Sequence, residues 1–121
     1  MSNIYEIPGW IDKIQEEIIE PGLPIIDPHH HLWHGPTQEQ GENNPYRYLL
    51  EDLWNDTGSG HNIKKTVFID CGQEYYKEGP DAFKPVGETE FVVEIAKEAQ
   101  KDPNQAQIAG IIGHVDMMLG D

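Results

Sequence analysis

Apolar residues along this chain follow two patterns, short continuous runs and runs at helical spacing. Short apolar runs bounded by turn residues are typical of buried strands. Strand candidates lie at 23–27, at 63–71 with a β-rich centre at 66–69, and at 108–112. Apolar residues three to four positions apart predict amphipathic helices instead. This spacing occurs at 10–18, 46–53 and 89–99. The predicted order is therefore helix, strand, helix, strand, helix, strand.

Turn-forming residues separate these segments. The expected helix ends are Pro21-Gly22, Gly58-Ser59-Gly60 and Asp102-Pro103-Asn104. Thr89 is expected to cap the third helix at its N-terminus. Two longer stretches, 35–44 and 72–87, predict loops because they are rich in glycine, proline and polar residues.

Strands that alternate with amphipathic helices predict an α/β fold with a parallel sheet. Three parallel strands are expected near Ile25, Phe68 and Ile111, with the connecting helices on one side because such crossovers share one hand. Parallel strands are normally buried on both faces, and the run Ile-Ala-Gly-Ile-Ile at 108–112 fits that environment.

Charge and cysteine content narrow the class of protein. The chain has 121 residues with 22 acidic and 8 basic side chains, a formal net charge of -14. Such a surface repels phosphate and anionic lipid, so we expect neither nucleic acid nor a membrane as partner. Cys71 is the single cysteine, which favours a reducing compartment. Without a predicted signal peptide or membrane span, a cytoplasmic protein is expected.

The strongest candidates for metal binding or catalysis lie in Asp27-Pro28-His29-His30-His31, at the end of the first apolar run. Side chains of extended backbone alternate, so His29 and His31 are expected to point one way and His30 the other. Two imidazoles at i and i+2 can reach one divalent ion. A His-x-His alone is a weak signal, and short histidine runs often bind metal incidentally. Its position at the carboxyl end of a strand, where Pro28 is expected to end the ladder, favours a catalytic site.

Polar residues after the other two strands are weaker candidates. Asp70, Cys71 and Gln73 follow the second strand, and His114 follows the third. Asp70 and His114 are possible pocket residues at the edge where α/β barrels form their sites. An ordinary strand-end carboxylate is an equal alternative for Asp70. Cys71 has no cationic sequence neighbour to lower its pKa, so it is not expected to be a nucleophile.

The long loop after the second strand carries aromatic and acidic residues. Tyr75 and Tyr76 lie within it and Glu88 and Glu90 lie beside its end. Long loops at the active face often shape substrate pockets. Acidic side chains in such positions are more often exposed to water, so both glutamates are expected to be solvated.

The histidine motif resembles a known family. Ile-Asp-Pro-His-His-His-Leu-Trp at 26–33 resembles the Asp-x-His-x-His opening of the amidohydrolase superfamily. It is most similar to the amidohydrolase-related branch of TIM-barrel metal-dependent hydrolases, which includes sugar lactonases and dicarboxylate lactonases. Four later segments resemble the same branch in the same order. They lie at 59–62, 68–72, 79–91 and 110–116.

The resemblance implies a fold and a set of ligands. His29 and His31 match the paired metal ligands of strand one, and the implied metal is divalent, zinc first and manganese second. Some lactonases of this branch are thought to work without a bound metal. The family takes further histidines from strands five and six and an aspartate from strand eight, which have no counterpart here. The implied fold is the N-terminal portion, about three βα units, of a TIM-type (β/α)8 barrel preceded by an N-terminal helix.

The chain is shorter than a complete eight-unit barrel of this kind. The strand starts near 24, 63 and 107 give roughly 40 residues for each βα unit, so eight units need about 320. The expected division is an N-terminal helical extension at 1–22 and a partial barrel domain at 23–121. The chain is interpreted as a fragment, a truncated gene product or one piece of a split protein. Open strand edges, especially at 108–112, are expected to favour self-association.

Two functions follow as hypotheses. The first is a hydrolase that cleaves a lactone ester or an amide of a small polar metabolite with metal-activated water. The second is a non-catalytic remnant that at most binds metal weakly or assembles with another chain. Turnover of simple lactones by the pure protein distinguishes the two.

Overall fold

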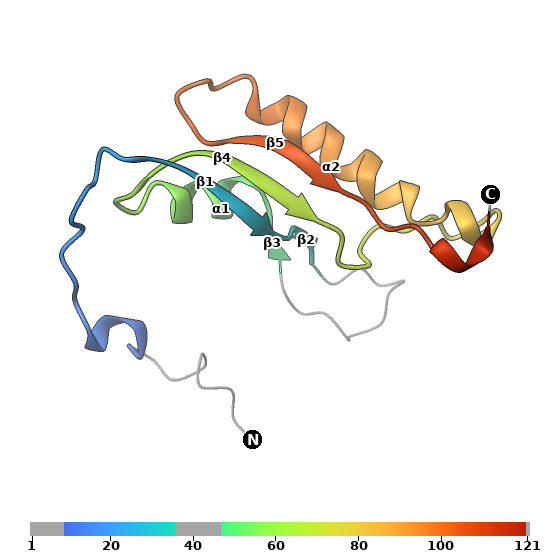
Figure 1. Cartoon of the computed structure of the whole chain (residues 1–121), viewed down its shortest axis with the longest axis horizontal. Helices are drawn as coiled ribbons and strands as arrows, with labels where there is room; N and C mark the ends of the chain where they lie inside the picture. Colours follow the sequence, from blue (N-terminus) through green and yellow to red (C-terminus); the bar gives the residue numbers. More distant parts are fainter. Residues whose placement is uncertain (1–8, 36–46, 121) are drawn as a thin grey trace.

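The computed structural model of the chain describes residues 9–35 and 47–120. Its centre is a three-stranded sheet in the order β1-β4-β5 (Figure 1). The strands are β1 (Pro24–His30), β4 (Asn62–Ile69) and β5 (Gln107–Ile112). The middle strand β4 pairs in parallel with both neighbours. The three parallel strands predicted from the apolar runs are therefore confirmed.

Two helices connect these strands, α1 (Leu50–Thr57) before β4 and α2 (Val86–Ala99) before β5. Leu50 and Trp54 of α1 line a cavity together with Glu98 near the end of α2, and Val92 of α2 packs in the core with Phe68 of β4. The His30 and Phe68 rings touch, with centroids 5.8 Å apart. Both helices therefore cover the same face of the sheet, as predicted (Figure 1).

The core is small and centres on Phe68 of the middle strand. Leu32, Phe68 and Val92 are essentially inaccessible to solvent, and partly buried apolar side chains surround them. The surrounding side chains are Tyr48, Phe91, Ile95, Ile108 and Ile111. The apolar stripe of α2 thus lies over β4 and β5, which is the packing that a βαβ unit requires.

A second, two-stranded sheet was not predicted. It pairs β2 (Trp33–His34) with β3 (Arg47–Tyr48) in antiparallel register. The Trp33 and Tyr48 rings lie opposite each other with centroids 6.3 Å apart. Strands of two residues are too short to show periodicity, so sequence patterning could not find them. The loop predicted at 35–44 lies, apart from Gly35, outside the described residues.

The N-terminal helix predicted over 10–18 is wrong. Only a 3-10 turn, η2 (Ile11–Lys13), forms there, and the chain then runs without helix to β1. Two apolar side chains of the predicted helix face remain largely in solvent, since Trp10 is 44% exposed and Ile14 is 74% exposed. A nine-residue helix is unstable in water unless packing supports it. The division of the chain at residue 22 stays a prediction.

Two predicted boundaries also need correction. β1 continues through Pro28 to His30, but its pairing with β4 is interrupted between Asp27 and His30, where proline offers no N–H. α2 begins at Val86, so Thr89 lies inside the helix and does not cap it. Pro85 precedes the first helical residue with φ -60°, a value that suits a helix start.

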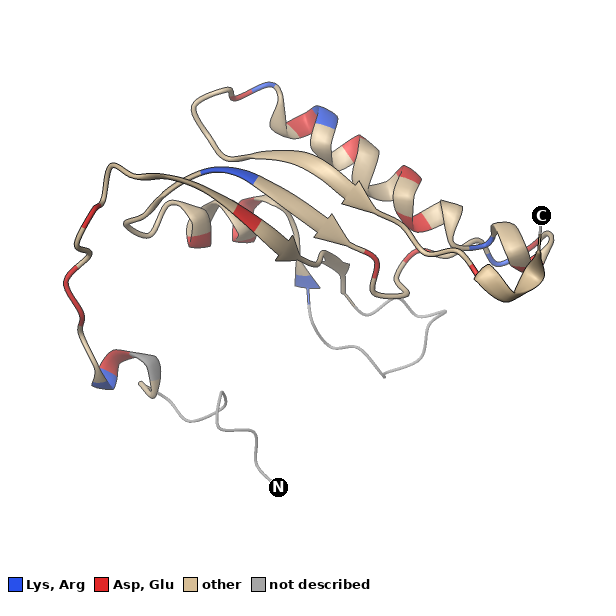
Figure 2. Cartoon of the chain, viewed as in Figure 1, with Lys and Arg blue, Asp and Glu red and all other residues tan. Residues whose placement is uncertain are grey.

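The sheet is not buried on both faces in the described part of the chain, contrary to expectation. Ile26 of β1 is 60% exposed and Ile112 of β5 is 54% exposed. Acidic side chains are spread over α1, α2 and the N-terminal segment, with few basic ones among them (Figure 2). No described helix has the length and apolar character needed to cross a membrane.

Candidate functional site

His29 and His31 converge at the carboxyl end of β1. Their Nε2 atoms are 3.2 Å apart and their ring planes are nearly perpendicular. His30 turns the other way, where it is buried against Phe68. The alternation predicted for the three histidines is therefore confirmed.

The hydrogen-bond partner of His31 Nδ1 determines which nitrogen of that ring carries the proton. Nδ1 of His31 lies 2.7 Å from the backbone carbonyl oxygen of Ile69, at the end of the neighbouring strand β4. A carbonyl only accepts, so Nδ1 carries the proton and donates. In the neutral ring, Nε2 of His31 then presents a lone pair toward His29. Such a backbone contact is the usual way in which a metal-binding histidine is oriented.

The spacing of the two nitrogens fits a shared ion. Two nitrogens at zinc-bonding distance and tetrahedral angle lie about 3.3 Å apart, close to the observed 3.2 Å. The same distance allows Nε2–H of His29 to donate a hydrogen bond to Nε2 of His31 when no ion is bound. The two nitrogen donors and their spacing therefore fit a divalent metal. Without a metal, the same two nitrogens can form a hydrogen bond with each other.

His30 has a structural role on the opposite face. Its Nε2 lies 3.0 Å from the hydroxyl of Thr66, a residue of β4 that is inaccessible to solvent. Burial lowers the pKa of His30, which favours the neutral imidazole. His30 thus packs β1 onto β4 and leaves its two neighbours to face the site.

A cavity of about 380 Å³ opens beside the pair, between β1 and α1. Polar side chains from several elements line it together with His29, His30 and His31; they include Asp27, Tyr48, Asp56 and His61. The Tyr48 hydroxyl donates to Asp56, and burial together with this bond raises the pKa of Tyr48. A small polar molecule has room to bind next to the imidazoles.

A third ligand is missing from the described part of the chain. Within residues 9–35 and 47–120, no group of three or more His, Cys, Asp or Glu side chains is arranged to hold a metal. Asp27 accepts the backbone N–H of His29 at 3.2 Å instead. His114 is exposed after β5, and neither it nor Asp70 lines the cavity beside the pair. The structure therefore does not bring the two possible pocket residues to that cavity.

The residues after β4 form a separate polar cluster. Asp70 accepts hydrogen bonds through Oδ1 from the Tyr75 hydroxyl at 2.8 Å and from the Gly72 N–H at 3.3 Å. The Cys71 thiol donates to Glu88 Oε1 at 3.3 Å. Burial and the nearby Glu88 raise the pKa of Cys71 to about 12. The expectation that Cys71 is no nucleophile agrees with this thiol staying protonated.

Glu88 is the residue that sequence reasoning misjudged. It was interpreted as a solvated acid, but it is completely buried in the first turn of α2. It accepts the backbone N–H groups of Cys71 at 3.1 Å and Gly72 at 2.9 Å, so it fastens the β4 exit to the helix. The available signal was its spacing, because Glu88 lies four positions before Val92 on the apolar stripe of α2.

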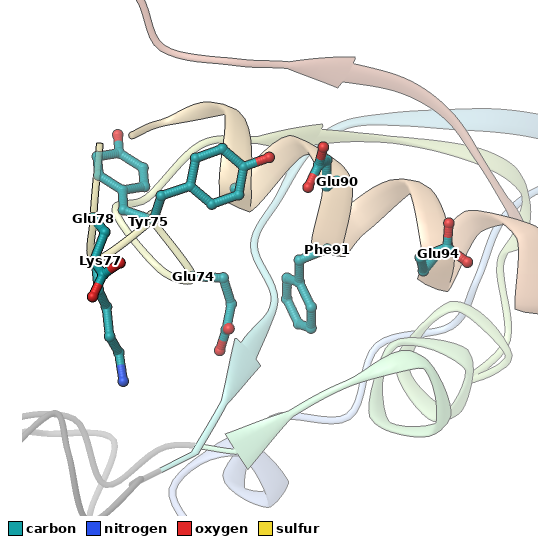
Figure 3. A pocket seen from close by; sticks show the side chains of 9 residues that line it. Glu74, Tyr75, Lys77, Glu78, Glu90, Phe91 and Glu94 are labelled. Carbon is teal, nitrogen blue, oxygen red and sulfur yellow. The ribbon is translucent and has the colours of Figure 1, made fainter. Parts of the chain in front are cut away.

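The loop after β4 and one side of α2 border another cavity, of about 710 Å³, which is wide open to solvent (Figure 3). Tyr75, Tyr76 and Phe91 supply its aromatic wall, and Glu74 and Glu90 are among its acids. The long loop therefore does shape a pocket. The cavity next to this loop and the cavity beside the histidine pair have no lining residue in common, so they are different sites.

Comparison with protein-family models, with curated proteins and with solved structures finds no match for this chain.

Proposed function

We propose that this chain supplies the first two metal ligands of an amidohydrolase-type hydrolase, on the opening βα units of a TIM-type barrel. The observation that carries the proposal is the convergence of His29 and His31, with Nε2 atoms 3.2 Å apart at the carboxyl end of β1. The substrate class is a small polar metabolite with a lactone ester or an amide. The cavity next to the pair supports a ligand of that size and polarity.

The chain's own residues hold and orient the donors. The Ile69 carbonyl fixes the His31 ring, and the bond from the His29 N–H to Asp27 restrains the backbone between the two strand-end residues. A divalent ion bound there supplies Lewis acidity toward a carbonyl and a water of lowered pKa. Imidazole ligands suit zinc, and they bind manganese less strongly.

The proposed site is incomplete within the described residues. Catalytic zinc sites usually combine three protein ligands with one water, whereas two imidazoles converge here. Further ligands and a base would come from another segment or another chain. The absence of a third ligand from the described part also favours the second candidate function, a non-catalytic chain that binds metal weakly or assembles with a partner.

Zinc should bind weakly to the 121-residue chain, at the histidine pair, because two imidazoles leave the ion short of protein ligands. Titration calorimetry with zinc should give an affinity that disappears in the His29→Ala/His31→Ala variant. It should persist in His114→Ala, which removes an exposed histidine that does not line the cavity beside the pair. Added Mn²⁺ should broaden the His29 and His31 imidazole signals first. Broadening centred on other histidines would overturn the proposed site, and sub-nanomolar zinc affinity would show a complete one.

Turnover by the same chain should stay at background. Hydrolysis needs a fixed ion, an oriented water and a base, and a misplacement of about one ångström can cost roughly a hundredfold in rate. The assay uses pure protein with zinc or manganese against a panel of aldonolactones and simple amides. Saturable turnover that vanishes in the His29→Ala/His31→Ala variant would show that the chain is an enzyme by itself, contrary to this expectation.

A further inference from the structure

Two carboxyl groups at the end of β4 share one backbone donor. The Gly72 N–H lies 2.9 Å from Oε2 of Glu88 and 3.3 Å from Oδ1 of Asp70. One N–H that reaches both acids places their carboxyl groups side by side. The two residues come from different elements, the strand exit and the first turn of α2, so the contact holds those elements together.

The hydrogen bonds around the pair leave one oxygen without a donor. Glu88 uses both oxygens to accept from Cys71 and Gly72. Asp70 accepts from Tyr75 and Gly72 through Oδ1, while its buried Oδ2 has no partner among the described residues. The donors named here are two amides, a thiol and a phenol, none of which carries a positive charge. Two adjacent ionised carboxylates in such a place would repel each other strongly.

We propose that Asp70 and Glu88 share a single proton, and that this proton latches the loop after β4 onto α2. A protonated carboxyl is a donor, so the proton supplies the hydrogen bond that Asp70 Oδ2 lacks. Loss of the proton leaves two charges side by side and loosens residues 70–76. Tyr75 and Tyr76 belong to this segment and line the cavity of Figure 3, so the latch controls the shape of that cavity. This inference does not depend on the proposed metal site.

The direction of the pH dependence follows from the surroundings. Burial raises the pKa of Glu88, and Asp70 raises it further, against the bonds from Cys71 that lower it. Cys71 and Tyr75, which face the pair, have pKa values raised to about 12 and stay neutral while the pair titrates. A carboxyl with a raised pKa binds its proton more tightly in the folded chain than in the unfolded chain. The stability it contributes is therefore present at low pH and is lost as the pH rises through the folded pKa.

The test compares the full chain with Glu88→Gln and Glu88→Ala. Glutamine donates to Asp70 Oδ2 permanently, while the Gly72 N–H keeps its bond to Asp70 Oδ1. We expect the urea midpoint of Glu88→Gln at neutral pH to equal or exceed that of the wild type and to fall less as the pH rises. Glu94→Gln is the matched control, because it makes the same substitution at an exposed site on the same helix. It should keep the wild-type pH dependence, and Glu88→Ala should lower the midpoint.

Carbon-13 NMR of the carboxyl groups tests the wild type directly, without a substitution. One carboxyl of the pair should titrate clearly above the ordinary aspartate and glutamate range of about 3.9 to 4.3, and this titration should be absent from Glu88→Gln. If every carboxyl of the wild type titrates in the ordinary range, both acids are ionised and the shared proton does not exist. Equal damage by Glu88→Gln and Glu88→Ala would also overturn the proposal.

Discussion

Replacing Phe68 by alanine is expected to remove most of the free energy of unfolding of this chain. Phe68 of the middle strand is 1% exposed, and among the described residues the buried cluster around it contains Leu32 and Val92. Truncation of a buried phenylalanine typically costs about 3–5 kcal/mol. The total for a small domain lies near the low end of about 5–15 kcal/mol, so one such loss leaves little margin.

Urea denaturation followed by circular dichroism measures the effect, and Phe83→Ala is the matched control. Phe83 is 63% exposed, so its truncation should change stability by less than about 0.5 kcal/mol. The Phe68 ring also contacts His30 and lies 6.5 Å from the His31 ring, so zinc binding should fail together with the fold. An unfolding midpoint of Phe68→Ala equal to that of Phe83→Ala would show that the core lies elsewhere.

The sheet could be predicted because its strands are local features of the sequence. The runs around Ile25, Phe68 and Ile111 are short, apolar and bounded by turn residues, and each coincides with a parallel strand. The N-terminal segment shows the limit of that reasoning. Its helical spacing is real, but a helix also needs a surface to pack on, and the sequence does not show that Ile14 has none.

In the candidate site, too, local features could be predicted from the sequence and contacts between distant residues could not. The convergence of His29 and His31 follows from the geometry of one extended strand and was predictable. The bond that orients His31 comes from Ile69, 38 positions away on another strand, and no local pattern reveals it. The burial of Glu88 had a local signal in its spacing from Val92, but its partners Cys71 and Gly72 meet it only after the long loop folds back.

Replacing Gly87 by alanine should destabilise the fold, although alanine is the better helix former. An added Cβ at this position, in the first turn of α2, would lie 2.9 Å from the backbone nitrogen of Tyr76 and would collide with the carbonyl oxygen of Glu74. These are backbone atoms, which cannot rotate away as a side chain would. Tyr76 is also anchored by its N–H bond to the Lys84 carbonyl at 3.0 Å.

The two opposing effects at Gly87 differ in size, and the measurement depends on that difference. Alanine gains about 0.5–1 kcal/mol over glycine in a helix, whereas overpacking of a close contact costs about 1–3 kcal/mol and more when backbone must move. We therefore expect a lower urea midpoint for Gly87→Ala. Tyr75 and Tyr76 should also become more accessible to solvent quenchers of their fluorescence. Gly22→Ala is the control, because an added Cβ there meets nothing within 4 Å. If Gly87→Ala proved as stable as Gly22→Ala, the loop after β4 would not be packed on α2 as described, and the Glu88 contacts next to it would be in doubt as well.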